Sequence, residues 1–394
     1  ANTGTSRHVV VVGGGFAGAT VAKYIRIWSG DQVTVTLVDP KARHTSCVMS
    51  NLVLNKRLKL RELQLSYESL SQRYGVNVLR DTAQEIDGNA QRIKLKNGGW
   101  LNYDKLVVAA GISFKKISGL DYKKVPHAWI AGSQTNLLRK QLTELKTGST
   151  FVMSIPEAPY RCPPGPYERA CVVADMLKRK GGGRVIVLDA NSDIQAEKPT
   201  FSRAFNELYS DIIEYRPNTS VGSVDSDNRV VHTSSGSVES DVLNIIPNQR
   251  ANGFLKRAGL TGRGNWAAVD PVTYESTLNN FPGVYVIGDA QATGQPKSAH
   301  MANSQAKICA DAVIRSLYDV PTHDEERLQN ITTNSACYSP ITYDEASWLT
   351  ANFAYDQSQG TMQLKHIGEA EKWNRENYQQ MFTWANNLFA DSFF

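Results

Sequence analysis

The chain has 394 residues, of which 41% are apolar and 21% are charged, and its net charge is +5. This length predicts two or three domains with buried cores, and the mild charge, without a block of like charges, argues against nucleic-acid binding. The sequence contains no run of 18 uncharged apolar residues, so we predict no membrane-spanning helix.

The first residues bear on whether a leader was removed, and the cysteine spacing bears on whether the protein binds a metal. The chain starts at Ala1 with a polar stretch instead of Met, which fits a mature form whose leader was removed, although a chain prepared for purification could begin in the same way. Five cysteines cannot all pair, and none has the C-x-x-C spacing of a zinc or thioredoxin site. We therefore predict no metal centre.

The first strong element is an apolar strand followed by a glycine turn and a helix. Val9–Val12 is an unbroken β-branched run, typical of a buried parallel strand, and Gly18–Ile27 has a helical pattern. Between them, residues 13–18 read G-x-G-x-x-G, which allows a tight turn and lets backbone N–H groups approach a pyrophosphate. The next strand, Gln32–Val38, ends at Asp39, where a carboxylate can bind a ribose diol. We predict a dinucleotide-binding turn here.

The remaining strands of this first unit point to FAD. Short strands are predicted at 76–80, 92–95 and 100–101. Tyr103–Gly111 (YDKLVVAAG) resembles the strand before the domain crossover in disulfide-reductase flavoproteins. Phe281–Asp289, which lies within FPGVYVIGDA, resembles the strand whose aspartate binds the ribityl and diphosphate region of FAD in the same superfamily. A helix over Met301–Leu317 follows, and its N-terminus is a candidate to stabilise the pyrimidine carbonyl of a flavin.

A second α/β unit follows the first, and it lacks the expected second glycine fingerprint. Its predicted elements are the helices 136–145 and 168–179, the strands 151–155 and 184–189, and the apolar run 242–247. After the strand 151–155 the chain reads PEAPYRCPPGPYE, with prolines in place of the glycine turn and Cys162 at the centre. Because a nicotinamide would need that turn, we expect electrons to enter another way, and a cysteine is chemically competent for this.

After Pro321 the composition becomes polar and aromatic, which we interpret as a third, interface-type domain. The predicted fold is therefore α/β, with two Rossmann-like domains of the disulfide-reductase flavoprotein type and a C-terminal interface domain. The predicted boundaries are 1–115 with 250–320 for the FAD-binding domain, 116–249 for the second Rossmann-like domain, and 321–394 for the C-terminal domain.

The five cysteines divide into two groups. Cys171 and Cys309 stand among apolar residues of predicted helices and are interpreted as packing residues. Cys47 lies eight residues after Asp39, on a loop that can pass the dimethylbenzene edge of a flavin. It could form an 8α-thioether to FAD or be a buried free thiol.

Cys162 and Cys337 are predicted to lie in loops close to prolines. Cys162 precedes a helix, whose positive end favours a thiolate. From the sequence alone the two cysteines could be a redox pair, a structural disulfide or two unrelated thiols.

The segments GGGFAG, TSCVMSN, APYRCPPGPYE and VIGDA together resemble the flavoprotein subunit of flavocytochrome c sulfide dehydrogenase, a family related to sulfide:quinone oxidoreductase. The resemblance covers essentially the whole chain, and APYRCPPGPYE is its most specific part. It implies covalent FAD on Cys47, a catalytic disulfide between Cys162 and Cys337 that oxidises hydrosulfide, and Glu168 as a candidate base. It also implies a periplasmic protein that pairs with a c-type cytochrome subunit. Glu168 could equally be a first-turn helix acid favoured by the helix dipole.

The predicted cofactor contacts combine the glycine turn with the ends of neighbouring strands. They are Gly13, Gly14, Gly15, Phe16, Ala17, Gly18, Asp39, Cys47, Ala83, Ala110, Gly111, Gly288 and Asp289.

Three other functions remain open. A sulfide:quinone oxidoreductase would keep the cysteine pair and carry an apolar amphipathic C-terminal surface for membrane docking. An NAD(P)H oxidoreductase is disfavoured by the missing second fingerprint. A redox-sensing or electron-transfer flavoprotein would not turn over sulfide.

Overall fold

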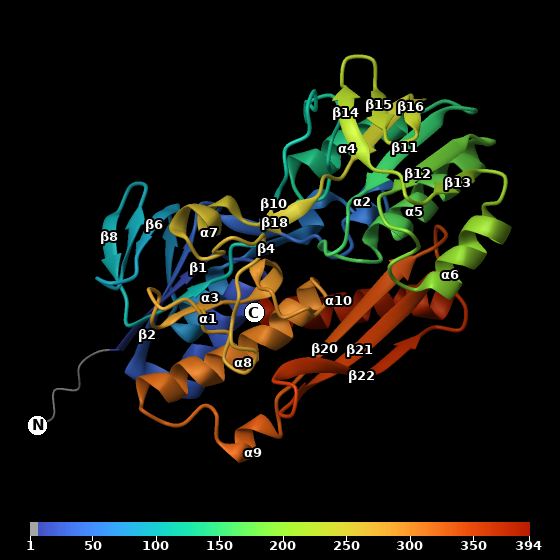
Figure 1. Cartoon of the computed structure of the whole chain (residues 1–394). Coiled ribbons are helices and arrows are strands. Elements are labelled where there is room, and N and C mark those ends of the chain that lie inside the picture. The colour runs from blue at the N-terminus through green and yellow to red at the C-terminus, as the bar shows by residue number, and fades with distance from the viewer. Residues whose placement is uncertain (1–6) are drawn as a thin grey trace, which may run out of the picture.

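The computed structural model describes residues 7–394 and shows two α/β units beside a C-terminal antiparallel sheet (Figure 1). Each unit is built on its own parallel sheet, so the predicted α/β class with two Rossmann-like units is confirmed. The expectation about the start of the chain at Ala1 lies outside the described residues.

The first unit contains a five-stranded parallel sheet in the order β19-β9-β1-β2-β5. Its strands are β1 (Arg7–Val12), β2 (Val33–Asp39), β5 (Asn77–Arg80), β9 (Lys105–Val108) and β19 (Val284–Val286). The main helices of this unit are α1 (Phe16–Ser29) and α8 (Ala299–Leu317). The chain runs from β1 outward to β2 and β5, and then returns to β9 on the other side. The strand order therefore reverses between β1 and β9, which is where open α/β sheets bind ligands.

Smaller elements surround this sheet. The antiparallel strands are β6 (Ala83–Asp87), β7 (Arg92–Leu95) and β8 (Gly99–Asn102), together with the pair β3 (Arg43–Thr45) and β4 (Gln64–Ser66). The short helices are α2 (Asn51–Leu54), α3 (Glu68–Tyr74) and α7 (Gly253–Ala258). β19 is shorter than the predicted strand over 281–289, because Gly288, with a φ of 78°, starts a 3₁₀ turn over Gly288–Ala290.

The second unit has a four-stranded parallel sheet in the order β13-β12-β11-β17. Its strands are β11 (Thr150–Ile155), β12 (Arg184–Asp189), β13 (Ile213–Arg216) and β17 (Val242–Ile245), and β14 (Val221–Asp225), β15 (Val230–Thr233) and β16 (Gly236–Glu239) form an antiparallel sheet beside it. Its helices are α4 (Ser133–Thr143), α5 (Gly165–Lys180) and α6 (Lys198–Arg203). The order reverses at β11, so the loop after β11, which carries Cys162, occupies the second switch point.

Two short strands link the units. β10 (Ile112–Phe114) carries the chain out of the first unit, and β18 (Gln249–Ala251) carries it back, paired antiparallel with β10. The predicted boundaries at 115–116 and 249–250 fall at this pair of strands.

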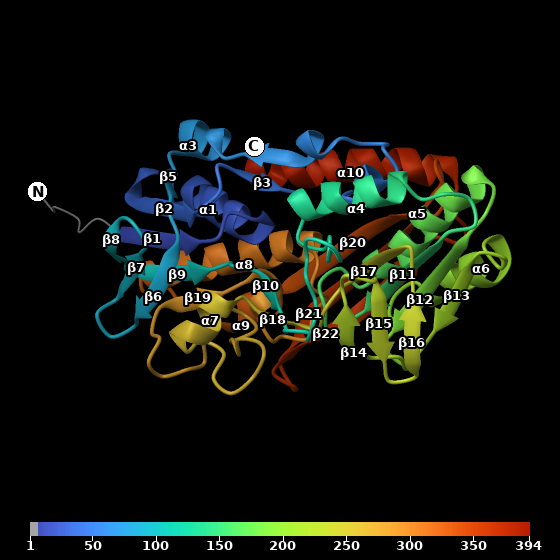
Figure 2. The same ribbon diagram turned by 90° about the horizontal axis from the view of Figure 1, so that it is seen from above.

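The C-terminal segment packs against both units (Figures 1 and 2). After α9 (Glu325–Leu328) it forms the antiparallel strands β20 (Thr332–Pro340), β21 (Ala346–Asp356) and β22 (Thr361–Glu369), and it ends in α10 (Arg375–Phe393). β20 contacts α8 of the first unit and α5 of the second. Leu388, Phe389 and Phe393 of α10 join the core formed by α1 and α8. None of the helices in residues 7–394 has the length and apolar character that crossing a bilayer requires.

Candidate functional site

A cleft with about 1490 Å³ of empty space, open to solvent, lies beside the first switch point. It is lined by residues from the ends of β1, β2 and β9 and from the turn after β19. All thirteen predicted cofactor contacts except Gly18 line this cleft: Gly13, Gly14, Gly15, Phe16, Ala17, Asp39, Cys47, Ala83, Ala110, Gly111, Gly288 and Asp289.

In the glycine turn between β1 and α1, backbone atoms leave no space for a side chain at Gly13 and Gly18. A Cβ on Gly13, whose φ is 101°, would lie 2.3 Å from the Ala109 carbonyl oxygen. A Cβ on Gly18 would lie 1.7 Å from the carbonyl oxygen of Gly13. Gly18 therefore lets α1 pack onto the turn, although it does not itself line the cleft. The first turn of α1 contains no acidic residue, so its N-terminal amides favour a phosphate group.

Asp39 stands at the end of β2, at the edge of the cleft. Its carboxylate accepts hydrogen bonds from the Gly14 N–H and the Lys41 N–H, both at 2.8 Å. These bonds orient the carboxylate, and each oxygen keeps a further lone pair. This arrangement suits a ribose diol.

Asp289 provides the test of whether FAD fits this cleft. Its side chain lines the cleft, and its Oδ1 atom is buried without a hydrogen-bond partner. Burial raises the pKa of Asp289, while the positive charges of Arg161 and Lys297 lower it. A buried oxygen without a donor is costly, and the hydroxyl groups of a ribityl chain would supply donors. The residues present therefore fit FAD.

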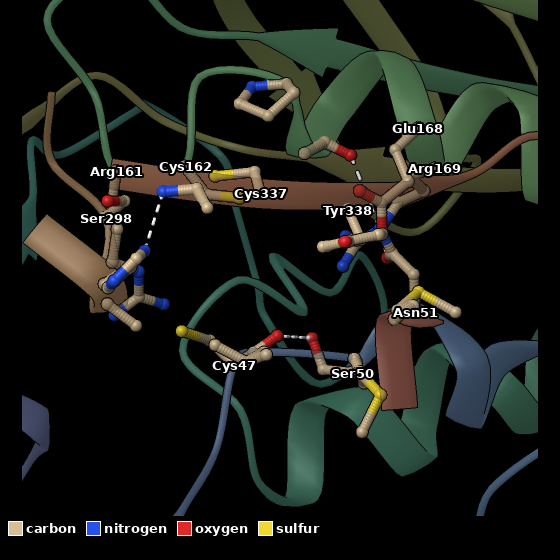
Figure 3. A pocket seen from close by; sticks show the side chains of 18 of the residues that line it. Cys47, Ser50, Asn51, Arg161, Cys162, Glu168, Arg169, Ser298, Cys337 and Tyr338 are labelled. Atoms are coloured by element: carbon tan, nitrogen blue, oxygen red, sulfur yellow. Dashed lines mark hydrogen bonds between the residues drawn. The ribbon is translucent and has the colours of Figure 1, made fainter. Parts of the chain in front are cut away.

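A second cavity, also open to solvent and with about 750 Å³ of empty space, adjoins the cleft. Cys162, Glu168 and Cys337 all line it, although they come from the loop before α5, from α5 itself and from β20 (Figure 3). Cys47 and Arg161 line both the cavity and the cleft, so they mark the boundary between the two spaces. The structure thus brings the three predicted catalytic residues together next to the predicted cofactor site.

The side chains of Cys162 and Cys337 point toward each other in Figure 3, and the charge of Cys337 contributes to the pKa of Cys162. All five cysteines are free thiols in the structure. The disulfide between Cys162 and Cys337 is therefore not formed here and stays a prediction. Cys171 and Cys309 are completely buried in apolar cores, which confirms their interpretation as packing residues.

Two expectations about these cysteines are wrong. The helix after Cys162 was expected to favour the thiolate, but burial raises the pKa of the Cys162 thiol well above its ordinary value. Burial likewise raises the pKa of Cys337 to about 12 and raises the pKa of Cys47. Cys337 lies within strand β20 and not in a loop, because β20 pairs with β21 through Pro340. Cys162 has a φ of 60°, an unusual backbone conformation for a residue other than glycine.

Glu168 is buried in the first turn of α5, where only 8% of its surface is exposed. Its Oε1 atom accepts a hydrogen bond of 2.9 Å from Asn51 Nδ2. Burial raises the pKa of Glu168 to about 8, an effect that Asn51 and Arg169 partly oppose. Glu168 can therefore gain or lose a proton near neutral pH, which suits a general acid or base.

Arg169, which also lines the cavity, connects several neighbouring residues through hydrogen bonds. Its guanidinium donates to Asn51 Oδ1 at 2.9 Å, to Asn244 Oδ1 at 2.9 Å and to the Ala128 carbonyl at 2.6 Å. Because Asn51 contacts both Arg169 and Glu168, it links α2 of the first unit to α5 of the second.

The N-terminus of α8 lies where the cavity meets the cleft. Ser298 caps the helix by accepting a hydrogen bond of 3.1 Å from the Met301 N–H, and Ala299 lines both spaces. Trp384 of α10 closes another side of the cavity and packs against Tyr338 at a ring distance of 5.4 Å.

Comparisons with known proteins identify the family. Residues 135–247 match the family model described as sulfide dehydrogenase (flavocytochrome c) flavoprotein chain, central, and residues 7–148 match the pyridine nucleotide-disulphide oxidoreductase family. The sulfide dehydrogenase (flavocytochrome c) flavoprotein chain of Chlorobaculum thiosulfatiphilum is 54% identical over 50 residues, which are 100% of that sequence and 13% of this chain. The chain therefore belongs to the family of sulfide dehydrogenase (flavocytochrome c) flavoprotein chains.

More distant relatives match over most of the chain. The mitochondrial sulfide:quinone oxidoreductase of Dictyostelium discoideum is 21% identical over 367 residues, which are 88% of this chain and 77% of that protein. The crystal structure of the sulfide:quinone oxidoreductase of Aquifex aeolicus has a TM-score of 0.81 at 16% identity and covers 98% of this chain and 92% of that one. The predicted disulfide-reductase flavoprotein fold is thereby confirmed.

Several residues of the site were not predicted from the sequence. Arg161 lies within APYRCPPGPYE and Asn51 within TSCVMSN, so their place in a recognised segment was an available signal. Asn252 and Arg257 line the cleft from the segment that follows β18, and no local pattern marks them.

Proposed function

We propose that this chain is a sulfide dehydrogenase that oxidises hydrosulfide at Cys162 and Cys337 and delivers the electrons to a c-type cytochrome subunit. The observation that carries the proposal is the meeting of both cysteines with Glu168 in one cavity that adjoins the cofactor cleft. Family membership supports the substrate, since the matching family is named for sulfide dehydrogenase.

FAD is the cofactor that we propose for the cleft. The N-terminus of α1 would hold the pyrophosphate, Asp39 the ribose diol, and Asp289 the ribityl region. The chemistry that FAD supplies when bound is acceptance of two electrons, which it can release one at a time. Cys47 lines the cleft, and this position supports the proposal that it carries FAD through an 8α-thioether.

In the proposed reaction, Cys162 and Cys337 begin as a disulfide. Hydrosulfide attacks one sulfur, so a bond forms between the substrate sulfur and one cysteine, and the bond between the two cysteines breaks. The products are a cysteine persulfide and a thiolate on the other cysteine. The substrate sulfur is oxidised, and the released thiolate holds the electron pair beside the cofactor cleft.

Glu168 would accept the proton that this reaction releases. When hydrogen sulfide enters in its neutral form, a proton must leave as the sulfur attacks. Glu168 lines the same cavity, and its pKa of about 8 lets it exchange that proton near neutral pH. Asn51 holds the carboxyl in place through its 2.9 Å hydrogen bond.

Sulfide:quinone oxidoreductase is the second candidate, because relatives with that name align with most of the chain. A quinone acceptor would require an apolar surface for membrane docking. In the C-terminal helix α10, however, the apolar residues Met381, Leu388 and Phe393 are buried against the rest of the protein. This packing disfavours α10 as a membrane-docking surface, and a cytochrome partner in the periplasm is the proposal that we retain.

Anaerobic addition of sulfide to the flavin-loaded protein tests the proposal. We expect rapid bleaching of the visible flavin spectrum and no response to NADH. Bleaching by NADH would favour a nicotinamide-dependent enzyme, and a flavin that sulfide leaves oxidised would favour a redox-sensing or electron-transfer protein.

A further inference from the structure

We propose that His300 is a positioning residue that holds Cys337 beside Cys162 in the cavity next to the cofactor cleft. The inference deepens the proposed function and rests on it, because two cysteines form a reactive disulfide only while their sulfur atoms stay within bonding reach. His300 lines the cysteine cavity from the first turn of α8. The segment 297–300, which leads into α8, contacts the backbone of both cysteine-bearing segments.

Lys297 connects Cys162 with the cofactor cleft. Its backbone carbonyl accepts a 2.7 Å hydrogen bond from the Cys162 N–H. Its side chain is buried, and the ammonium donates to the carbonyl oxygens of Asp289 at 2.8 Å and Gln291 at 2.7 Å. The same ammonium lies 3.9 Å from the centre of the Trp266 ring, close enough for a cation–π interaction. Because three groups hold the side chain, the Lys297 backbone is a fixed support for Cys162.

His300 connects the same end of α8 with the strand that carries Cys337. Its Nδ1 atom accepts a 2.8 Å hydrogen bond from the N–H of Ala336, the residue directly before Cys337. β20 is the edge strand of its sheet, so alternate N–H groups point away from β21 and need another acceptor. The imidazole supplies that acceptor, and it therefore fixes the backbone from which the Cys337 side chain extends.

A second contact of the same kind joins α8 to the open edge of β20. The Ser304 hydroxyl accepts a 3.2 Å hydrogen bond from the Asn334 N–H. Asn334 and Ala336 are two residues apart on the strand, so their N–H groups face the same side. Ser304 thus covers the strand edge as His300 does, but its contact is three residues from Cys337 and that of His300 is only one.

The hydrogen bond from Ala336 requires a neutral imidazole. A backbone N–H can only donate, so Nδ1 carries no proton and the proton of the neutral ring is on Nε2. Burial lowers the pKa of His300, the positive charge of Lys307 lowers it further, and the negative charge of Asp391 acts in the opposite direction. The ring also packs against Trp384, with the two ring centres 6.3 Å apart. These surroundings keep Nδ1 an acceptor near neutral pH.

The two supports act together on the cysteine pair. Because Lys297 and His300 are three residues apart, their contacts fix the backbones next to Cys162 and Cys337 relative to each other. The two cysteine side chains point toward each other in Figure 3. Without the contact of His300, the backbone beside Cys337 has more conformations, and the two sulfur atoms meet less often. The equilibrium between dithiol and disulfide should then shift toward the dithiol.

The test measures this equilibrium for the flavin-loaded protein in anaerobic glutathione redox buffers. Glutathione disulfide oxidises the pair, which forms one bond between Cys162 and Cys337 and releases two glutathione thiols. Alkylation of the remaining thiols, followed by mass spectrometry of the two peptides, gives the equilibrium constant. We expect His300→Phe, which keeps an aromatic ring without an acceptor, to lower this constant at least about tenfold, equivalent to about 30 mV. Flavin reduction by sulfide should slow by a similar factor.

Three further variants separate positioning from a general structural effect. His300→Asn should restore most of both values, because its side-chain oxygen can replace Nδ1 as the acceptor for the Ala336 N–H. Ser304→Ala is the matched control, since it removes the neighbouring contact between the same helix and strand, and it should behave as the wild type. His300→Ala removes the acceptor without adding bulk, so it gives the same comparison if the phenylalanine variant does not fold.

Wild-type values in both His300→Phe and His300→Ala would overturn the positioning role. An equal loss in Ser304→Ala would also overturn it, because coverage of the strand edge would then explain the effect. The disulfide equilibrium does not involve sulfide, so the two proposals can fail separately. If the wild type forms the disulfide but sulfide leaves its flavin oxidised, the proposed function falls and the thiol measurements still decide the role of His300. If the wild type forms no disulfide in any buffer, both proposals fall.

Discussion

Cys162 and Cys337 line the same cavity, and their substitution distinguishes a reactive pair from a structural link. We expect Cys162→Ser and Cys337→Ser each to abolish flavin reduction by sulfide, because one sulfur alone cannot form the disulfide that hydrosulfide attacks. Dithionite should still reduce the flavin in both variants, since the cofactor cleft is unchanged. The measurement is the stopped-flow absorbance of the flavin after anaerobic mixing.

A structural disulfide predicts a different result for the same variants. Closing so long a loop contributes several kcal/mol in the chain-entropy model, so the variants would lose thermal stability first and keep their activity while folded. Activity should therefore be expressed per folded, flavin-loaded protein. Near-normal turnover in either variant would remove the cysteine pair from the mechanism.

Acid precipitation of the wild type and of Cys47→Ala tests whether FAD is covalently bound to Cys47. We expect acid precipitation of the wild-type protein to leave yellow colour in the pellet, because a thioether survives denaturation. Cys47→Ala should still bind FAD through the turn at 13–18 and Asp39, but should release it on precipitation. A colourless wild-type pellet, or a tryptic peptide with unmodified Cys47, would contradict the linkage.

Glu168 should make stability depend on pH. Its pKa in the folded protein is raised to about 8, so the protonated carboxyl stabilises the fold. This stabilisation is fully present when the pH is below the ordinary pKa of a carboxyl group, and it is lost as the pH rises through 8. This loss amounts to about 2 kcal/mol between pH 6 and pH 8 for a shift of this size. In thermal unfolding, Glu168→Gln should lose less stability over that range than the wild type. Glu144→Gln, which changes an exposed carboxyl after α4, is the control and should follow the wild type.

The turn between β1 and α1 depends on the absence of a side chain at residue 18. Gly18→Ala would place a Cβ 1.7 Å from the Gly13 carbonyl oxygen, so α1 must move away from the strand. We expect a loss of roughly 1–3 kcal/mol of stability and weaker FAD retention. Gly222→Ala in β14 is the control, since its Cβ would meet only the His232 carbonyl, at 3.4 Å. Equal flavin content in the two variants would show that the turn tolerates a methyl group.

Elements defined by local patterns could be predicted from the sequence. The strand Arg184–Asp189 has the predicted bounds, because burial on both faces of a parallel sheet selects continuous apolar, β-branched runs. The turn between β1 and α1 lies where the glycine pattern predicts it. Twelve of the thirteen predicted cofactor contacts line one cleft, since parallel strands place their carboxyl ends at one edge of the sheet.

Features that depend on distant pairings could not be predicted. The proline near Cys337 predicts a loop there, but pairing with β21 holds Cys337 in a strand. Glu197 and Ser339 meet across 142 positions of the chain, and nothing near Glu197 in the sequence indicates a buried carboxyl. The expected thiolate at Cys162 was wrong because the helix end was considered without the burial that outweighs it.

The cysteine cavity is assembled from all parts of the molecule. Residues 47–51 come from the first unit, Cys162 and Glu168 from the second, and Cys337 and Trp384 from the C-terminal segment. α10 also completes the core around α1 and α8. The C-terminal segment therefore builds the site in addition to any role as an interface.

The electron acceptor can be tested on the whole flavin-loaded protein. In the second unit, the prolines and Cys162 occupy the switch point where a nicotinamide enzyme would hold phosphate, and α10 directs its apolar residues into the protein. From these two features we propose that neither NAD⁺ nor membrane quinone is the preferred acceptor. With sulfide as donor, we expect rapid reduction of a c-type cytochrome and slow reduction of a soluble quinone or NAD⁺, measured by the absorbance of each acceptor.

Cys337→Ser serves as the control, since it should abolish all sulfide-driven transfer and leave dithionite-driven reduction of the cytochrome intact. Efficient quinone reduction would favour the sulfide:quinone oxidoreductase alternative, because the acceptor is the property in which the two proposals differ.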